Sequence, residues 1–256
     1  MKHAALLCLA LNVGCTYSVV VGETPGAAGA TGAAGGPTSD SGAANGCPAN
    51  DWTNGTLCEP RFSLLCDNSQ LVIVEDASAS ENAAAHDLAQ ALATACPTPP
   101  SVRVTNQADT TVLESGSGRP ITGPGIALIM IGSPERQVGV AYLQQHAAAM
   151  IGKVDGAGYY LTSPEGKSAG ALNPASNNQD LTGVQTLLEP KSQSVVLSIF
   201  GQREAGSVAG VQDFVKRLPT LIVSLTWWYT LNWVDTNGDL MPEPTDDLLV
   251  GTTSGT

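Results

Sequence analysis

The feature that most constrains the fold is a set of short, continuous apolar runs that alternate with helix-like segments. The first run, residues 71–74, is followed almost at once by an alanine-rich segment whose apolar residues recur at helical spacing as far as Pro97. The stronger runs Ile126–Ile131 and Val195–Phe200 repeat the pattern. Continuous apolar runs are typical of strands covered on both faces, and their alternation with helices is typical of α/β proteins. The sequence therefore predicts an α/β fold, an α+β sandwich with a mixed β-sheet and helices on at least one face.

Local spacing predicts the other elements. Ser78 with Glu81 three residues later forms a capping box for the first helix. Further helices are expected at residues 138–150, at 207–218, and in a short segment capped by Asp180 or Thr182, with Val184, Leu187 and Leu188 on one face and Pro190 at its end. Further strands are expected at residues 102–104, 158–162 and 169–172, with a β-rich stretch at 221–234. The part from residue 191 to residue 256 is interpreted as a C-terminal βαβ-like extension.

The amino-terminal part has the composition of an export signal and a tether. Residues 1–14 combine a basic start with a short apolar run, as signal peptides do, and Cys15 then stands where a bacterial lipoprotein is lipidated. Asn12 departs from that motif, so ordinary secretion is the alternative. Residues 15–46 hold this anchor and a linker rich in Gly, Ala, Ser and Thr. We expect an extracytoplasmic protein, either a bacterial cell-envelope lipoprotein or a secreted protein, that meets the membrane only through its lipid anchor.

Export places the remaining cysteines in an oxidising compartment, where disulfides persist. Residues 47–67 form a Cys-containing loop, and the disulfide candidates are Cys47, Cys58, Cys66 and Cys96. Three pairings are open. A bond between Cys66 and Cys96 would clip the first strand to its helix and leave Cys47 with Cys58. A metal site made of these cysteines is disfavoured because no C-x-x-C pair occurs.

Charge and missing motifs narrow the function. The chain has 11 basic and 23 acidic residues, and its net charge of -12 repels nucleic acid. Neither a phosphate-binding glycine loop nor a G-x-S-x-G or H-E-x-x-H motif occurs in the sequence. Two histidines of the expected exported part, His86 and His146, are expected to face solvent. Four acidic residues in separate loops are expected to be solvated caps and turns: Asp76, Glu135, Glu165 and Asp180.

Four segments follow one another within residues 68–190: LVIVE leading into the helix from Ala77 to Ala84, ALIMIGSPE at 127–135, GYYLTSPEG at 158–166 and LTGVQTLLE at 181–189. This order resembles the non-catalytic α/β domain that precedes the barrel in bacterial family 20 hexosaminidases and family 84 β-N-acetylglucosaminidases. In those enzymes the catalytic carboxylates lie on the barrel, which takes about 250 residues. Only residues 191–256 remain here, so the resemblance implies a glycosidase accessory domain without a catalytic barrel.

The segment from Asp235 to Glu243 is a candidate calcium loop. It places side-chain oxygens at positions 1, 3, 5 and 9, and Ca²⁺ prefers such oxygen ligands. The ligand candidates are Asp235, Asn237, Asp239 and Glu243. The loop departs from the EF-hand at position 6, Leu240, and at position 12, Asp246. An ordinary turn between two strands explains the same residues with fewer assumptions.

An aromatic segment, residues 227–233, is the candidate ligand surface. In an extended strand Trp227, Tyr229, Leu231 and Trp233 would share one face. Exposed, the rings of Trp227, Tyr229 and Trp233 would offer sugar rings a flat surface for stacking. Buried, they would belong to the core, which is the favoured alternative because aromatic side chains dominate cores.

Taken together, the sequence predicts an exported, lipid-anchored, non-catalytic binding or scaffolding module. Its expected partner is a glycan, with amino-sugar polymers as the first candidate, or another cell-surface component, and not nucleic acid. Ca²⁺ is the cofactor candidate, and no residue is assigned a catalytic role. The alternatives are a truncated or diverged β-N-acetylhexosaminidase-like glycoside hydrolase and a structural envelope protein.

Overall fold

The computed structural model describes residues 61–145, 149–155, 158–172, 178–189, 191–243 and 246–253. The predicted signal peptide, the linker, Cys15, Cys47, Cys58 and His146 lie outside the described residues. The elements, in chain order, are the 3₁₀ helix η1 (Phe62–Leu65), β1 (Gln70–Glu75), α1 (Ala79–Ala95), β2 (Ser101–Asn106), β3 (Ile126–Ile131), α2 (Val138–Leu143), β4 (Ile151–Asp155), β5 (Gly158–Thr162), β6 (Ser168–Leu172), β7 (Gln179–Leu188), β8 (Val195–Phe200), α3 (Glu204–Leu221), β9 (Trp228–Val234) and β10 (Asp247–Thr253).

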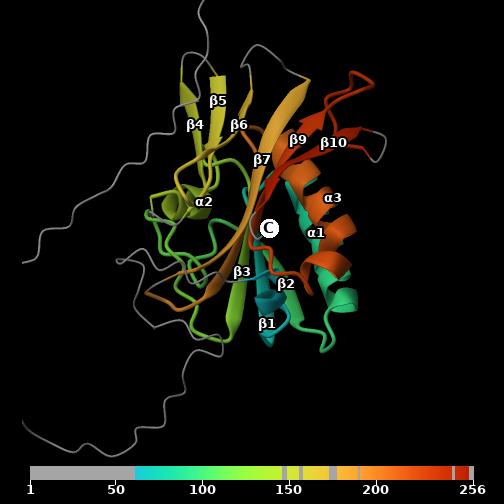
Figure 1. Ribbon diagram of the computed structural model, residues 1–256. Helices are drawn as coiled ribbons and strands as arrows, with labels where there is room; N and C mark the ends of the chain where they lie inside the picture. Colours follow the sequence, from blue (N-terminus) through green and yellow to red (C-terminus); the bar gives the residue numbers. More distant parts are fainter. Residues whose placement is uncertain are drawn as a thin grey trace, which may run out of the picture. The chain divides into compact units, whose positions relative to one another are not determined.

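A seven-stranded mixed sheet organises the described part (Figure 1). Its strand order is β10-β9-β7-β8-β3-β1-β2. Strands β2, β1, β3 and β8 run parallel, whereas β7 is antiparallel to both β8 and β9, and β10 is antiparallel to β9. The predicted fold class, a mixed sheet with helices, is confirmed. The segment after residue 191 belongs to the same sheet, because β8 lies between β7 and β3.

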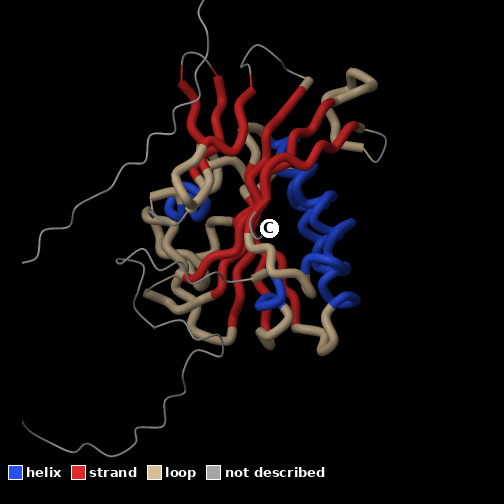
Figure 2. Tube along the Cα trace, viewed as in Figure 1, coloured by secondary structure: helices blue, strands red, loops and turns tan. Residues whose placement is uncertain are grey.

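Alternate residues of the parallel strands face two different layers. Leu71 and Ile73 of β1 pack in a core with α1 and α3, whereas Val72 and Val74 pack in a second core with α2 and the small antiparallel sheet β4-β5-β6. Figure 2 shows the two long helices side by side on one side of the main sheet. Because both faces of β1, β3 and β8 are covered, these strands need apolar side chains at nearly every position, which is why they are continuous apolar runs in the sequence.

The first strand and helix form where the sequence predicts them, but only half of the predicted capping box is present, because the Ser78 N–H donates to Asp76 at 3.1 Å instead of to Glu81. The Ser78 hydroxyl accepts a hydrogen bond of 3.1 Å from the Glu81 backbone N–H and caps α1. Cys66, just before β1, is bonded to Cys96, just after α1, so the predicted clip is present. Within the described ranges, no helix has the length and the hydropathy that a membrane span requires.

Three of the elements expected from the sequence differ from those in the structure. The helix expected after Asp180 is wrong: Gln179–Leu188 is the ten-residue strand β7, with eight consecutive buried residues between its two ends. Burial between two layers explains apolar residues whose spacing also fits a helix. Helix α2 ends at Leu143 instead of reaching residue 150. Helix α3 continues to Leu221, and the following strand begins only at Trp228.

Candidate functional site

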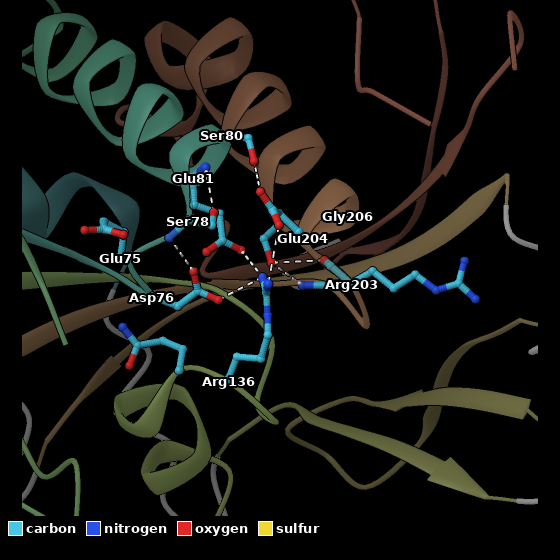
Figure 3. A network of polar contacts seen from close by, with 12 residues as sticks. Glu75, Asp76, Ser78, Ser80, Glu81, Arg136, Arg203, Glu204 and Gly206 are labelled. Carbon is cyan, nitrogen blue, oxygen red and sulfur yellow. Dashed lines mark hydrogen bonds and ion pairs between the residues drawn. The ribbon is translucent and has the colours of Figure 1, made fainter. Parts of the chain in front are cut away.

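The carboxyl ends of β1 and β3 form the point where the chain leaves the sheet in two directions. The loop after β1 leads to α1 on one face, and the loop after β3 leads to α2 on the other face. In open α/β sheets this divergence opens a crevice in which ligands bind. The loop from β8 to α3 ends at the same edge. Four charged side chains meet there, and we call them the carboxyl-edge cluster: Asp76, Glu81, Arg136 and Glu204 (Figure 3).

Arg136 lies at the centre of the cluster. Its Nη2 atom lies 2.8 Å from Oδ2 of Asp76 and 3.2 Å from Oε1 of Glu81, and its Nη1 atom lies 3.4 Å from Oε2 of Glu204. The three carboxyl groups come from the β1–α1 loop, from α1 and from α3. The Arg136 side chain is 42% exposed and that of Glu204 is 37% exposed, whereas those of Asp76 and Glu81 are 2% and 0% exposed. One guanidinium that solvent can reach therefore bridges three carboxyl groups, two of them buried.

Asp76 and Glu81 form a carboxyl pair in the interior. Oε2 of Glu81 receives no hydrogen bond from any donor among the described residues, and Oδ2 of Asp76 has only its ion pair with Arg136. Burial raises the pKa of Glu81 to about 9, and the hydrogen bond and negative charge of Asp76 act in the same direction, against Arg136. Glu81 is therefore protonated at neutral pH, and its proton can serve as the missing donor between the two oxygens.

The turn between β1 and α1 is held in an uncommon backbone conformation. Ala77 has a φ of 77°, in the left-handed region that favours glycine. The Glu75 carboxylate accepts the Ala77 N–H, and Oδ1 of Asp76 accepts the Ser78 N–H at 3.1 Å. The Ser80 hydroxyl donates to the Glu204 carboxylate and so ties the first turn of α1 to that of α3. Such backbone outliers cluster at functional sites, where the surroundings hold them in place.

Asp180 caps the amino terminus of α3 from the neighbouring strand β7. Its carboxylate accepts hydrogen bonds from the backbone N–H groups of Gln202, Arg203 and Gly206, at 3.0, 2.8 and 3.1 Å. Burial raises the pKa of Asp180 to about 6, although these N–H donors pull it down. A Cβ atom at residue 206 would lie 2.4 Å from the Asp180 carboxyl carbon, so the close approach requires glycine.

The expectation that Asp76 and Asp180 are solvated caps and turns is wrong. Backbone N–H groups and the Arg136 guanidinium take the place of water around these carboxylates. Glu135 and Glu165 are exposed, as expected, and Glu165 accepts a hydrogen bond of 3.0 Å from Nε1 of Trp228. His86 is exposed on α1 beside Asp87, also as expected.

The aromatic segment is buried, so it offers no flat exposed ring to a sugar. Trp227, Tyr229 and Trp233 are each at most 3% exposed. The expected common face is also wrong for Trp227: it precedes β9 and packs in the core with α2, whereas Tyr229 packs on the opposite side of the sheet, with α1 and α3. Nε1 of Trp233 donates a hydrogen bond of 2.9 Å to Asp246. These aromatic residues pack between the main sheet and the layers that cover it.

The candidate calcium loop is held by its own hydrogen bonds. Both carboxylate oxygens of Asp235 accept backbone N–H groups, including that of Leu240 at 2.9 Å. Nδ2 of Asn237 donates to Asp239 and Glu243, so an amide N–H, not an oxygen, lies between these carboxylates. Leu240 has a φ of 62°, at the position where the EF-hand has glycine. Among the described residues no three His, Cys, Asp or Glu side chains are arranged to hold a metal ion. Calcium binding stays an untested prediction from the sequence, and the hydrogen bonds within the loop argue against it.

Sequence motifs do not identify the carboxyl-edge cluster. Arg136 and Glu204 carry no recognisable motif, Glu81 was interpreted only as part of a capping box, and Asp76 has only its position after a strand. That position was the available signal: Asp76 and Arg136 follow β1 and β3, and the carboxyl ends of neighbouring parallel strands lie at one edge of a sheet. No protein-family model and no curated protein matches this chain.

Proposed function

We propose that this chain is an exported, membrane-tethered binding or scaffolding module that holds its ligand at the carboxyl edge of the parallel strands and does not cleave it. The observation that carries the proposal is the convergence of charged side chains from two loops and two helices on the carboxyl edge of β1 and β3. Ligands of open α/β sheets bind at this place. The signal-like start and Cys15 support export and anchoring.

The arrangement of carboxyl groups supports binding over hydrolysis. Glycoside hydrolysis needs two carboxyl groups on either side of the bond, about 5 to 9.5 Å apart. Asp76 and Glu81 instead lie side by side, with almost no exposed surface, and Arg136 bridges them. Because the two carboxyl groups are in hydrogen-bonding contact with each other, they leave no room for a glycosidic bond between them.

Amino-sugar polymers are the first ligands to test, and the cluster favours those with free amino groups. The aromatic strand is buried, so contact through stacked rings has no support. An ammonium group, by contrast, makes strong charge-assisted hydrogen bonds to carboxylates. A polymer of glucosamine carries such groups, whereas N-acetylated chitin does not and hyaluronan is acidic.

The test is a pull-down of the described domain on chitosan, chitin and hyaluronan beads. We expect retention on chitosan alone, lowered by Glu204→Gln and unchanged by Asp87→Asn, which alters an exposed carboxylate on the outer side of α1. Equal retention of both variants, or no retention of the wild type, would overturn the proposal. A fluorogenic N-acetylglucosaminide assay runs beside it, and turnover above background would show an enzyme instead.

A further inference from the structure

We propose that the carboxyl-edge cluster is a site for a guanidinium or ammonium group of a ligand, and that the Arg136 side chain occupies it until such a group takes its place. This inference rests on the proposed function and deepens it, because it names the chemical group that is recognised. The fit of a guanidinium is visible in the molecule, since Arg136 supplies one (Figure 3).

Arg136 satisfies the cluster only in part. One of its contacts, to Asp76, is short at 2.8 Å, whereas those to Glu81 and Glu204 measure 3.2 and 3.4 Å. Its Nη2 atom contacts two carboxyl groups at once, and its Nη1 atom reaches Glu204 only at 3.4 Å. A guanidinium has five N–H donors and an ammonium three. A ligand cation that is not attached to the backbone can place these donors closer to Glu81 and Glu204 than Arg136 does, whose contacts measure 3.2 and 3.4 Å.

The position of Arg136 allows it to leave. It lies in the loop between β3 and α2, its side chain is 42% exposed, and its neighbour Glu135 is exposed as well. Its departure therefore opens the cluster to solvent without breaking a strand. Three carboxyl groups then face an incoming cation, and the net charge of -12 draws cations toward the chain.

The test uses Arg136→Ala, which empties the site, and methylguanidinium as the probe. At constant ionic strength, we expect Arg136→Ala to melt below the wild type and millimolar methylguanidinium to raise its melting temperature with saturation. Adding Glu204→Gln to this variant should weaken the apparent affinity about tenfold. Arg103→Ala, which removes an exposed arginine paired with Asp109, is the matched control and should show no saturable response. Tetramethylammonium, which has no N–H donor, should not stabilise Arg136→Ala.

The same titration on the wild type tests whether the ligand cation takes the place of the Arg136 side chain. Because Arg136 competes there, the wild type should bind methylguanidinium at least about tenfold more weakly than Arg136→Ala does. Equal affinity in the two proteins, equal rescue of Arg103→Ala, or rescue by tetramethylammonium would overturn the inference. If Arg136→Ala does not fold, Arg136→Gln takes its place, and failure of both to fold in methylguanidinium also counts against the site. Chitosan retention without any methylguanidinium response would leave the proposed function standing and remove this inference alone.

Discussion

Replacing Glu81 by glutamine tests whether this buried carboxyl group holds a proton in the folded chain. Its pKa of about 9, against an ordinary value of 4.5, means that the folded state keeps a proton that the unfolded chain releases above pH 4.5. The contribution of Glu81 to stability is therefore fully present below pH 4.5 and is lost as the pH rises toward 9. Each pKa unit corresponds to about 1.4 kcal/mol, so roughly 3 kcal/mol is lost by pH 7.

Glutamine has the shape of a protonated glutamate and carries no charge. Its amide N–H can donate to Asp76, and its carbonyl oxygen can accept from Arg136, as Oε1 of Glu81 does at 3.2 Å. We therefore expect Glu81→Gln to match the wild type near pH 4.5 and to be more stable by roughly 3 kcal/mol at pH 7. The variant should also lose the part of the pH dependence of the free energy of unfolding between these values that Glu81 contributes.

The assay is urea denaturation of both proteins at pH 4.5, 7 and 8.5 with the disulfide intact, followed by the fluorescence of the buried tryptophans. Burial raises the pKa of Asp180 to about 6, so its contribution to the free energy of unfolding also falls with rising pH. This fall is the same in both proteins and cancels in their difference. Glu135→Gln, at an exposed position, is the control and should change nothing. A Glu81→Gln variant that is less stable at pH 7, with an unchanged pH slope, would refute the shared proton and show an ionised Glu81 held by Arg136.

Three further predictions concern the fold and the calcium loop. Asp180→Ala leaves three backbone N–H groups at the start of α3, one buried and two partly buried, without the Asp180 carboxylate as acceptor and should cost about 3 kcal/mol in urea denaturation, whereas Asp180→Asn should cost less. Replacing both Cys66 and Cys96 by alanine opens a bridge across 30 residues and should lower the free energy of unfolding by about 3 to 4 kcal/mol in thermal melts, and no change in stability would contradict the clip. Because the oxygens of the candidate calcium loop already accept N–H groups, millimolar Ca²⁺ should not shift the melting temperature. A saturable shift that Asp239→Asn removes would instead establish calcium binding.

The strands that could be predicted are those whose burial produces a recognisable pattern in the local sequence. β1, β3 and β8 are covered on both faces and are apolar throughout, so their runs identify them. β7 is equally buried, but it contains Thr182, Gln185 and Thr186, whose burial between layers depends on tertiary contacts. Polar residues broke the apolar run, and the apolar residues that remained fitted a helix as well as a strand.

The carboxyl-edge cluster could not be predicted from the sequence for a related reason. Asp76 and Arg136 are 60 positions apart in the numbering, and only the pairing of β1 with β3 brings them together. Asp180 was identified as a helix cap, but the helix that it caps begins at Glu204, after another strand. Sequence patterns describe neighbours along the chain, whereas this site is made of residues that become neighbours in the sheet.

The measurement that tests the central claim most directly is a calorimetric titration of the domain with a glucosamine oligomer, followed by a mass spectrum of the oligomer. The account predicts saturable heat in the wild type, a loss of affinity of about tenfold in Glu204→Gln, and an oligomer recovered at its original length. No heat in the wild type, the same affinity in Glu204→Gln, or a shortened oligomer would contradict it.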